Sequence, residues 1–305
     1  MRQREPIQVR TDGLPVIASG VHGTVYLYDE ERILKLYNPE VSRETVEKER
    51  ALAREAFIIG VPTSIPYEVA VCGSRYGIIF EKIRSDSLGH LISSRPDMME
   101  QYAVQYAALA RTLHGIHTQR TVFPELKAEL EQRLPRLVPF CTEADMRLLE
   151  DLITRIPDAD NLIHGDLHPG NIMVQDGELL LIDMPEMMRG SPKWDLAAIY
   201  RDMVIGPMQP SEELEKSIGM KAPLIARTGR AFFRAYTGLE GEKLEKYMDA
   251  LLPLFGMNTV FTLGAAEDRN GEACARIIPM LMAEAVRKHE DELRAMLAEN
   301  ETQGD

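Results

Sequence analysis

Alternating apolar and polar positions mark the first part of the chain. Residues 14–83 contain five short runs rich in Val, Ile, Leu and Tyr, and one charged run with helical spacing. A period of two predicts strands, whereas apolar residues three and four apart predict a helix. The pattern therefore predicts one helix from about residue 42 to 59, inserted after the third of five strands, which we place at residues 14–19, 24–29, 32–38, 67–73 and 76–83.

Helical spacing takes over after residue 84. Apolar residues recur at three and four in residues 97–117 and 143–156, for example. Two strand-like runs at 171–175 and 178–183 are the exception, and between them lies Asp176-Gly177, a pair typical of a tight hairpin turn. We therefore expect an α+β chain with a small N-terminal lobe, residues 1–83, and a larger helical lobe, residues 84–305.

Composition and charge narrow the possible partners. The 305 residues are 45% hydrophobic and 27% charged, which suits a globular chain with one large or two moderate cores. The net charge of −13 repels phosphate backbones and anionic lipid, so we expect neither nucleic acid nor a membrane as a partner. Three scattered Cys argue against a zinc site or a disulfide framework, and no apolar segment follows the N-terminal charges. The expected compartment is the cytoplasm, and no pattern indicates an oligomeric state.

A polar segment precedes and enters the predicted hairpin. In HGDLHPGN, residues 164–171, Asp166 and Asn171 lie five apart, and Asp183 follows the apolar run LLLI seventeen residues after Asp166. Phosphoryl transfer needs a carboxylate that orients the attacking hydroxyl and accepts its proton, and oxygen ligands for Mg²⁺ on the ATP phosphates. Asp166 suits the first role, and Asn171 and Asp183 suit the second. The competing interpretation is a surface hairpin whose Asp and Asn residues only form turns.

The N-terminal region supplies complementary groups. Gly20 and Gly23 lie between two predicted strands, where their backbone N–H groups can approach phosphate, and Lys35 lies in the next strand. A buried Lys needs an anionic partner. Glu49 is the best candidate because it shares a helix face with apolar residues, and Glu47 is the alternative.

These motifs together resemble the aminoglycoside phosphotransferase and choline kinase-like families. HGDLHPGN is similar to their catalytic loop, LLLIDM to their metal-binding segment, and SPKWDLAAIY to the helix that follows. The resemblance runs from about residue 14 to 200. It implies a bilobal protein kinase-like fold with a five-stranded antiparallel N-terminal lobe that binds nucleotide, and a helical C-terminal lobe that carries the catalytic and acceptor-binding residues.

The resemblance also implies roles for single residues. Asp195 is expected to be a buried anchor for the backbone of the catalytic loop, and His164 a brace within that loop. His168 is expected either near the transferred phosphoryl group or as part of the loop structure alone. Glu81 through Ile83 are expected to bind adenine through main-chain groups. Three other histidines, for which we expect surface or helix-packing positions, are His22, His114 and His117.

Departures from the wider kinase pattern concern the acceptor. Ala18 replaces the first Gly of the phosphate-binding loop, and Met184 and Pro185 replace the Phe and Gly that usually follow the metal-binding Asp. Residues 186–194 are too few for a long phosphorylatable activation loop. These features favour a small-molecule kinase over a switched protein kinase.

The sequence thus predicts an ATP- and Mg²⁺-dependent phosphotransferase that acts on a hydroxyl of a small molecule. The acidic charge favours an acceptor that is neutral or cationic. Three alternatives stay open: a protein serine/threonine kinase, a catalytically silent pseudokinase that serves as a binding module, and an AMP-transferring relative.

Overall fold

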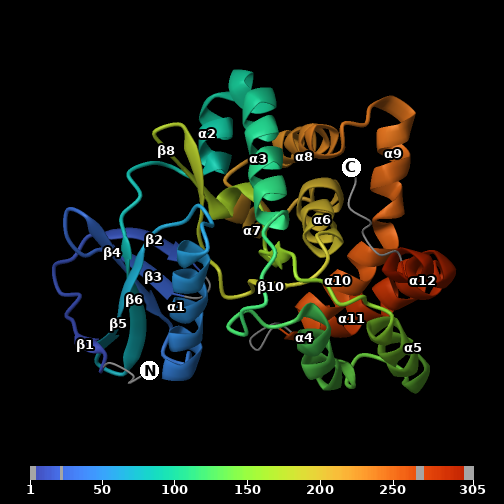
Figure 1. Ribbon diagram of the computed structural model, residues 1–305, viewed down its shortest axis with the longest axis horizontal. Coiled ribbons are helices and arrows are strands. Elements are labelled where there is room, and N and C mark those ends of the chain that lie inside the picture. Colours follow the sequence, from blue (N-terminus) through green and yellow to red (C-terminus); the bar gives the residue numbers. More distant parts are fainter. Residues whose placement is uncertain (1–4, 21–22, 266–270, 299–305) are drawn as a thin grey trace. The chain divides into compact units, whose positions relative to one another are not determined.

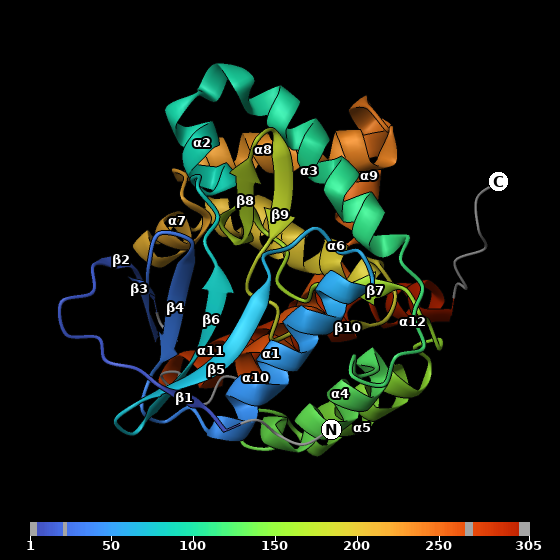
Figure 2. The same cartoon turned by 60° about the vertical axis from the view of Figure 1, so that its left-hand side comes forward.

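The computed structural model describes residues 5–20, 23–265 and 271–298 (Figures 1 and 2). The chain forms two compact units: residues 1–88 with 171–185 make the first, and residues 89–170 with 186–305 make the second. In the described ranges, no helix combines the length and the apolar character needed to cross a membrane. The described residues form a sheet and many helices, which confirms the predicted α+β fold with one difference in the number of strands.

The first unit is built on a six-stranded sheet in the order β1-β5-β6-β4-β3-β2. The strands are β1 (Ile7–Gln8), β2 (Val16–Gly20), β3 (Gly23–Leu27), β4 (Arg32–Tyr37), β5 (Pro66–Cys72) and β6 (Arg75–Glu81). Five are the predicted antiparallel strands, and β1 adds a sixth that runs parallel to β5 with Ile7 opposite Ala70. The prediction of five strands was wrong by this one, because two residues are too short to show alternation.

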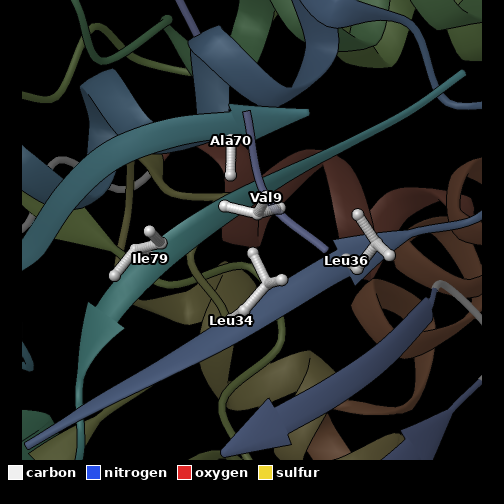
Figure 3. Close-up of a cluster of buried hydrophobic side chains, with 5 residues drawn as sticks. All are labelled: Val9, Leu34, Leu36, Ala70 and Ile79. Carbon is white, nitrogen blue, oxygen red and sulfur yellow. The ribbon is translucent and has the colours of Figure 1, made fainter. Parts of the chain in front are cut away.

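Helix α1 (Arg43–Ile58) packs on β5 and β6. It begins at Ser42, whose side chain accepts a hydrogen bond from the Thr45 N–H as an N-cap. Its buried positions include Val46, Leu52 and Ala56, together with the charged Glu49. Along β4, Leu34 and Leu36 alternate with Lys35 and Tyr37, so the two pairs lie on opposite faces of the sheet. Leu34 and Leu36 belong to the apolar cluster drawn in Figure 3, whose members are Val9, Leu34, Leu36, Ala70 and Ile79.

The hairpin of β8 (Ile172–Gln175) and β9 (Glu178–Leu181) completes the first unit. Asp176 and Gly177 both have left-handed backbone conformations, with φ of 54° and 85°, as a two-residue hairpin turn requires. The predicted turn is thereby confirmed. Leu181 holds the hairpin against the chain that follows α1, because its N–H donates to Pro62 O at 2.8 Å and its carbonyl accepts from Thr63 Oγ1 at 2.8 Å.

Helices make up most of the second unit, with one short sheet of β7 (Leu162–Ile163) and β10 (Met188–Arg189). Its core includes the contact of α3 with α8, where the rings of Tyr106 and Phe232 lie 4.3 Å apart. A π-helical segment, Arg201–Ile205, continues α6, and another, Met282–Arg287, follows α11. The helices are α2 (Leu88–Ser94, whose first residue falls in the first unit), α3 (Met99–His114), α4 (Leu126–Arg133), α5 (Glu143–Thr154), α6 (Lys193–Tyr200), α7 (Glu212–Ile218), α8 (Ala222–Thr237), α9 (Gly241–Ala250), α10 (Leu252–Ala265), α11 (Gly271–Leu281) and α12 (Glu290–Ala298).

The contact of α10 with the second π-helical segment generates a stability prediction. A Cβ added at Gly256 would lie 2.4 Å from Ala285 Cβ. Gly256→Ala should therefore lower the free energy of unfolding by about 1–3 kcal/mol, the usual cost of overpacking. Denaturant unfolding measures it, with Gly271→Ala as the control, because a Cβ there would meet no atom within 4 Å. Equal unfolding free energies for Gly256→Ala and the wild type would contradict the predicted close contact.

Candidate active site

Lys35 is the charged centre of the first unit. Its Nζ lies 2.9 Å from Glu49 Oε1 and 2.7 Å from Asp183 Oδ1, so it joins β4 to α1 and to the end of the β8–β9 hairpin. Burial opposes the charge on Lys35, but the carboxylates of Asp183 and Glu49 raise its pKa above the usual value. Of the two candidate partners, Glu49 makes the pair, whereas Glu47 accepts a hydrogen bond from Arg43 at 2.7 Å.

Asn171 and Asp183 flank the open end of the hairpin. The Ile182 N–H donates to Asn171 O at 3.0 Å, and Asp183 is the next residue along the chain. Asp183 has a φ of 61°, a left-handed conformation that Asp and Asn adopt more readily than other non-glycine residues. A carboxylate and an amide oxygen fit Mg²⁺, which is usually held by one or two protein oxygens together with phosphates and water. Among the described residues no group of three or more His, Cys, Asp or Glu forms a metal site.

The two predicted loop glycines differ in what surrounds them. Gly20 ends β2 opposite Gly23, which begins β3. A Cβ at Gly23 would lie 2.3 Å from Leu36 O, so the strand pairing itself requires glycine there, whereas a Cβ at Gly20 would meet no atom within 4 Å. Residues 21–22, including His22, lie outside the described residues. Gly20 is therefore the position whose glycine no strand contact explains.

The predicted adenine-binding segment is partly occupied by hydrogen bonds of its own. The Glu81 N–H donates to Ile65 O at 2.9 Å, and the Glu81 carboxylate accepts from the Ile65 N–H at 3.2 Å. The next amide, of Lys82, donates to Glu31 O. The Glu81 and Lys82 N–H groups are thus already used within the fold, and the expectation that Glu81 through Ile83 bind adenine by main-chain groups stays a prediction. In the part of the chain that the structure describes, the Ile83 N–H makes no hydrogen bond.

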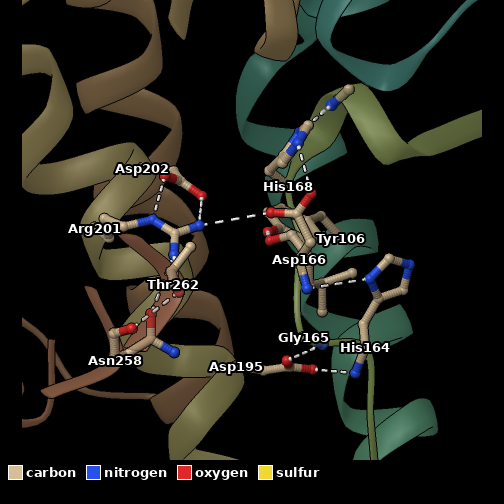
Figure 4. A network of polar contacts seen from close by, with 12 residues as sticks. Tyr106, His164, Gly165, Asp166, His168, Asp195, Arg201, Asp202, Asn258 and Thr262 are labelled. Carbon is tan, nitrogen blue, oxygen red and sulfur yellow. Dashed lines mark hydrogen bonds and ion pairs between the residues drawn. The ribbon is translucent and has the colours of Figure 1, made fainter. Parts of the chain in front are cut away.

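Asp166 lies in the second unit between two basic side chains, His168 and Arg201 (Figure 4). His168 Nε2 is 3.6 Å from its Oδ2, and Arg201 Nη2 is 3.6 Å from its Oδ1. Burial would raise the pKa of Asp166, but His168 and Arg201 hold it well below the usual range. Asp166 is thus ionised at neutral pH and can accept a hydrogen bond from a hydroxyl. Because a carboxylate of low pKa is a weak base, it is suited to take the proton of that hydroxyl only late in a reaction.

His168 is buried rather than exposed on the loop. The Gly170 N–H donates to its Nδ1 at 3.1 Å, so in the neutral ring Nε2 carries the proton that faces Asp166. The structure therefore places His168 beside Asp166. Its predicted proximity to a transferred phosphoryl group stays a prediction.

Arg201 is the residue that sequence reasoning missed. Its guanidinium forms two 2.8 Å hydrogen bonds to the Asp202 carboxylate and a third, of 3.1 Å, to Asn258 Oδ1 on α10. Asp202 and Asp166 raise the pKa of Arg201 against the effect of burial. The signal in the sequence is an Arg-Asp pair directly after the apolar helix α6, but the contacts of Arg201 with Asp166 and Asn258 join residues far apart in the chain, which no local pattern predicts.

Asp195 fixes the backbone that carries Asp166. It is fully buried and accepts from the N–H groups of His164 at 2.8 Å and Gly165 at 2.7 Å, which confirms its predicted role as a buried anchor (Figure 4). Burial opposes its charge, but the hydrogen bond from His114 Nε2 at 3.1 Å, along with the His164 backbone N–H, lowers the pKa of Asp195 below the usual value.

Other side chains complete this support. The Asp166 N–H donates to His164 Nδ1 at 3.3 Å, so His164 braces the loop as predicted. Tyr106 Oη donates to Leu167 O at 2.7 Å. His114 is more than the packing residue expected, because it links Asp195 to Tyr236 Oη, at 2.8 Å. His117 is half-exposed beside Asp160, at 2.6 Å.

The chain is similar to a known protein family in sequence and to solved structures in fold. The model of the phosphotransferase enzyme family matches residues 13–221. None of the curated proteins compared matches the chain. Three similar solved structures share its fold. The gentamicin complex of APH(2")-IIa is 16% identical, covers 89% of this chain and 91% of its own, and has a TM-score of 0.58; the amicoumacin kinase hAmiN is 16% identical, covers 90% of each chain, and has a TM-score of 0.56. A choline/ethanolamine kinase family protein from Mesorhizobium loti is 15% identical, covers 93% of this chain and 92% of its own, and has a TM-score of 0.56.

The family match covers every residue assigned a chemical role, from Gly20 to Arg201. It confirms the family predicted from the HGDLHPGN, LLLIDM and SPKWDLAAIY motifs. The chain belongs to the phosphotransferase enzyme family.

Proposed function

We propose that this chain transfers the γ-phosphoryl group of ATP, with Mg²⁺, to a hydroxyl of a small molecule. The observation that carries the proposal is Lys35, a buried ammonium held by Glu49 and Asp183 at 2.9 and 2.7 Å. A charge held so firmly in a family of phosphotransferases is suited to bind nucleotide phosphates. Gly20 and the Ile83 N–H would contribute backbone contacts to the phosphates and to adenine.

The proposed reaction is an in-line displacement. The acceptor oxygen forms a bond to the γ-phosphorus while the bond from that phosphorus to the β–γ bridging oxygen breaks, and ADP leaves. Mg²⁺, held by Asn171 and Asp183, would neutralise charge on the phosphates. Asp166 orients the hydroxyl and takes its proton as the new bond forms. The low pKa of Asp166 fits this late proton transfer better than early abstraction.

A small molecule is favoured over a protein as the acceptor by the segment after Asp183. Met187 and Met188 are buried, and the Arg189 guanidinium is tied to Glu125 at 2.8 Å. β10 pairs with β7, so this segment is part of the fold rather than an open docking strand. Gentamicin, streptomycin and amicoumacin, named in complexes of similar structures, support a small-molecule acceptor. A neutral or cationic acceptor agrees with the net charge of −13.

The pseudokinase alternative is disfavoured because Lys35, Asp166, Asn171 and Asp183 are all retained. The direct test is ATP consumption by the purified protein across a panel of amino alcohols, sugars and aminoglycosides. We expect consumption above background with at least one hydroxyl-bearing compound, and none with that compound's deoxy analogue. Mg·ATP binding without turnover on any acceptor would favour the pseudokinase.

Asp183→Asn should weaken Mg·ATP binding by roughly 10- to 100-fold, the range expected when a contact to a charged group is lost. Asn tolerates the left-handed backbone of this position, so the change removes charge without forcing a new conformation. Calorimetry measures the effect. Asp176→Asn is the matched control, because Asp176 has the same backbone conformation at the other end of β9's hairpin. Unchanged affinity for Asp183→Asn would remove Asp183 from the metal site.

Asp166→Asn should leave Mg·ATP affinity nearly intact but lower kcat by roughly 10²- to 10⁴-fold, the usual contribution of a positioned acid or base. Steady-state kinetics with calorimetry separate the two quantities, and Asp158→Asn, at an exposed position, is the control. A parallel loss of nucleotide affinity would instead make Asp166 a metal ligand.

The pH profile should depend on Arg201. Because the folded pKa of Asp166 is depressed, its carboxylate stays ionised as the pH falls, and activity is lost only when the pH reaches that low pKa. Arg201→Met removes a positive charge 3.6 Å from Oδ1, so the pKa of Asp166 should rise and the acid limb of kcat/KM should move to higher pH. Arg155→Met, at an exposed ion pair, is the control. Identical acid limbs in Arg201→Met and the wild type would show that Arg201 does not act through charge.

A further inference from the structure

Tyr37 lies on the same side of β4 as Lys35, two residues further along the strand. Its ring is buried and packs against Val46 of α1 and Ile78 of β6. Lys35 Nζ lies 5.1 Å from the centre of this ring, within the range of a cation–π contact. The Tyr37 ring therefore packs directly beside the Lys35 ammonium.

The Tyr37 hydroxyl is buried and makes no hydrogen bond with any described residue. A buried donor left unpaired destabilises a fold, and native structures contain few of them. Burial and the charge of the Glu49 carboxylate raise the pKa of Tyr37 well above the usual value, so the hydroxyl keeps its proton. The hydroxyl lies close enough to the Glu49 carboxylate for a weak interaction that also raises its pKa, but the two groups do not reach the geometry of a full hydrogen bond.

A bound nucleotide would weaken the ion pair between Lys35 and Glu49, the carboxylate beside this hydroxyl. Lys35 divides its ammonium between Glu49 and Asp183, and phosphate oxygens drawn to Lys35 compete with both. Asp183 is partly exposed, whereas the Glu49 side chain is only 5% exposed. A buried carboxylate that loses part of its ion pair is costly unless another donor replaces it. Tyr37 offers an unused donor beside it.

We propose that Tyr37 is a positioning residue for nucleotide binding: its hydroxyl donates to Glu49 when phosphate engages Lys35, and its ring keeps the ammonium in place. This inference rests on the proposed function, because it assumes that Lys35 binds nucleotide phosphates. The Tyr37 hydroxyl would then have opposite effects in two states. It destabilises the nucleotide-free protein, where it is unpaired, and stabilises the nucleotide-bound protein, where it donates to Glu49.

Tyr37→Phe is the decisive variant because it retains the ring and removes only the hydroxyl. We expect an unchanged or higher unfolding midpoint without nucleotide, a Kd and KM for Mg·ATP raised roughly 3- to 10-fold, and a nearly unchanged kcat. Calorimetry, denaturant unfolding and steady-state kinetics give the three quantities. Tyr76→Phe is the matched control, because Tyr76 packs against the same apolar cluster without contacting Lys35, and its Mg·ATP affinity should not change.

A second pair of variants tests the partner. In a Glu49→Met background, which keeps the length of the side chain but removes the acceptor, Tyr37→Phe should change Mg·ATP affinity less than twofold. A full 3- to 10-fold effect in that background would overturn the inference, as would wild-type affinity in Tyr37→Phe alone. Joint loss of stability and affinity in Tyr37→Phe would also overturn it, by indicating a purely structural hydroxyl. If the wild type binds no Mg·ATP, the proposed function fails and the inference fails with it; wild-type binding that Tyr37→Phe leaves intact rejects the inference alone.

Discussion

A buried ammonium must be compensated, and the first unit is arranged around the compensation of Lys35. Its two carboxylate partners come from separate elements, Glu49 from α1 and Asp183 from the end of the β8–β9 hairpin. Removing either partner leaves excess charge in a site where water screens little. The pairs therefore fix the register of a helix and a hairpin against the sheet. They also place a positive charge beside a carboxylate, the two groups that the proposed Mg·ATP site requires.

The second unit solves a related problem with a buried carboxylate. Asp195 accepts two backbone N–H groups of the loop and a hydrogen bond from His114, so its charge is fully compensated inside the helical core. The loop that it fixes presents Asp166 between His168 and Arg201. In each unit a buried charged side chain therefore positions a more exposed carboxylate. Lys35 positions Asp183 in the first unit, and Asp195, through the loop backbone, positions Asp166 in the second.

The sequence was sufficient wherever the signal was local and periodic. Five strands followed from alternation and the hairpin from Asp176-Gly177. The apolar face of α1 favoured Glu49 over Glu47 as the partner of Lys35, and the structure decided for Glu49. β1 was missed because two residues carry no period, and its position depends on pairing with β5, more than sixty residues away. Arg201 was missed because its partners Asp166 and Asn258 lie far from it in the chain, so that no spacing rule joins them.

The role of His114 was also out of reach, because its partner Asp195 lies 81 residues further along the chain and on a different helix. The family motifs located the chemical groups, whereas the contacts that set their pKa values had to come from the fold. The most direct test of phosphoryl transfer is ³¹P NMR of ATP incubated with the protein, Mg²⁺ and an acceptor that supports turnover. The account predicts ADP and one new phosphate monoester resonance in equal amounts. AMP attached to the protein or acceptor, or free phosphate alone, would contradict it.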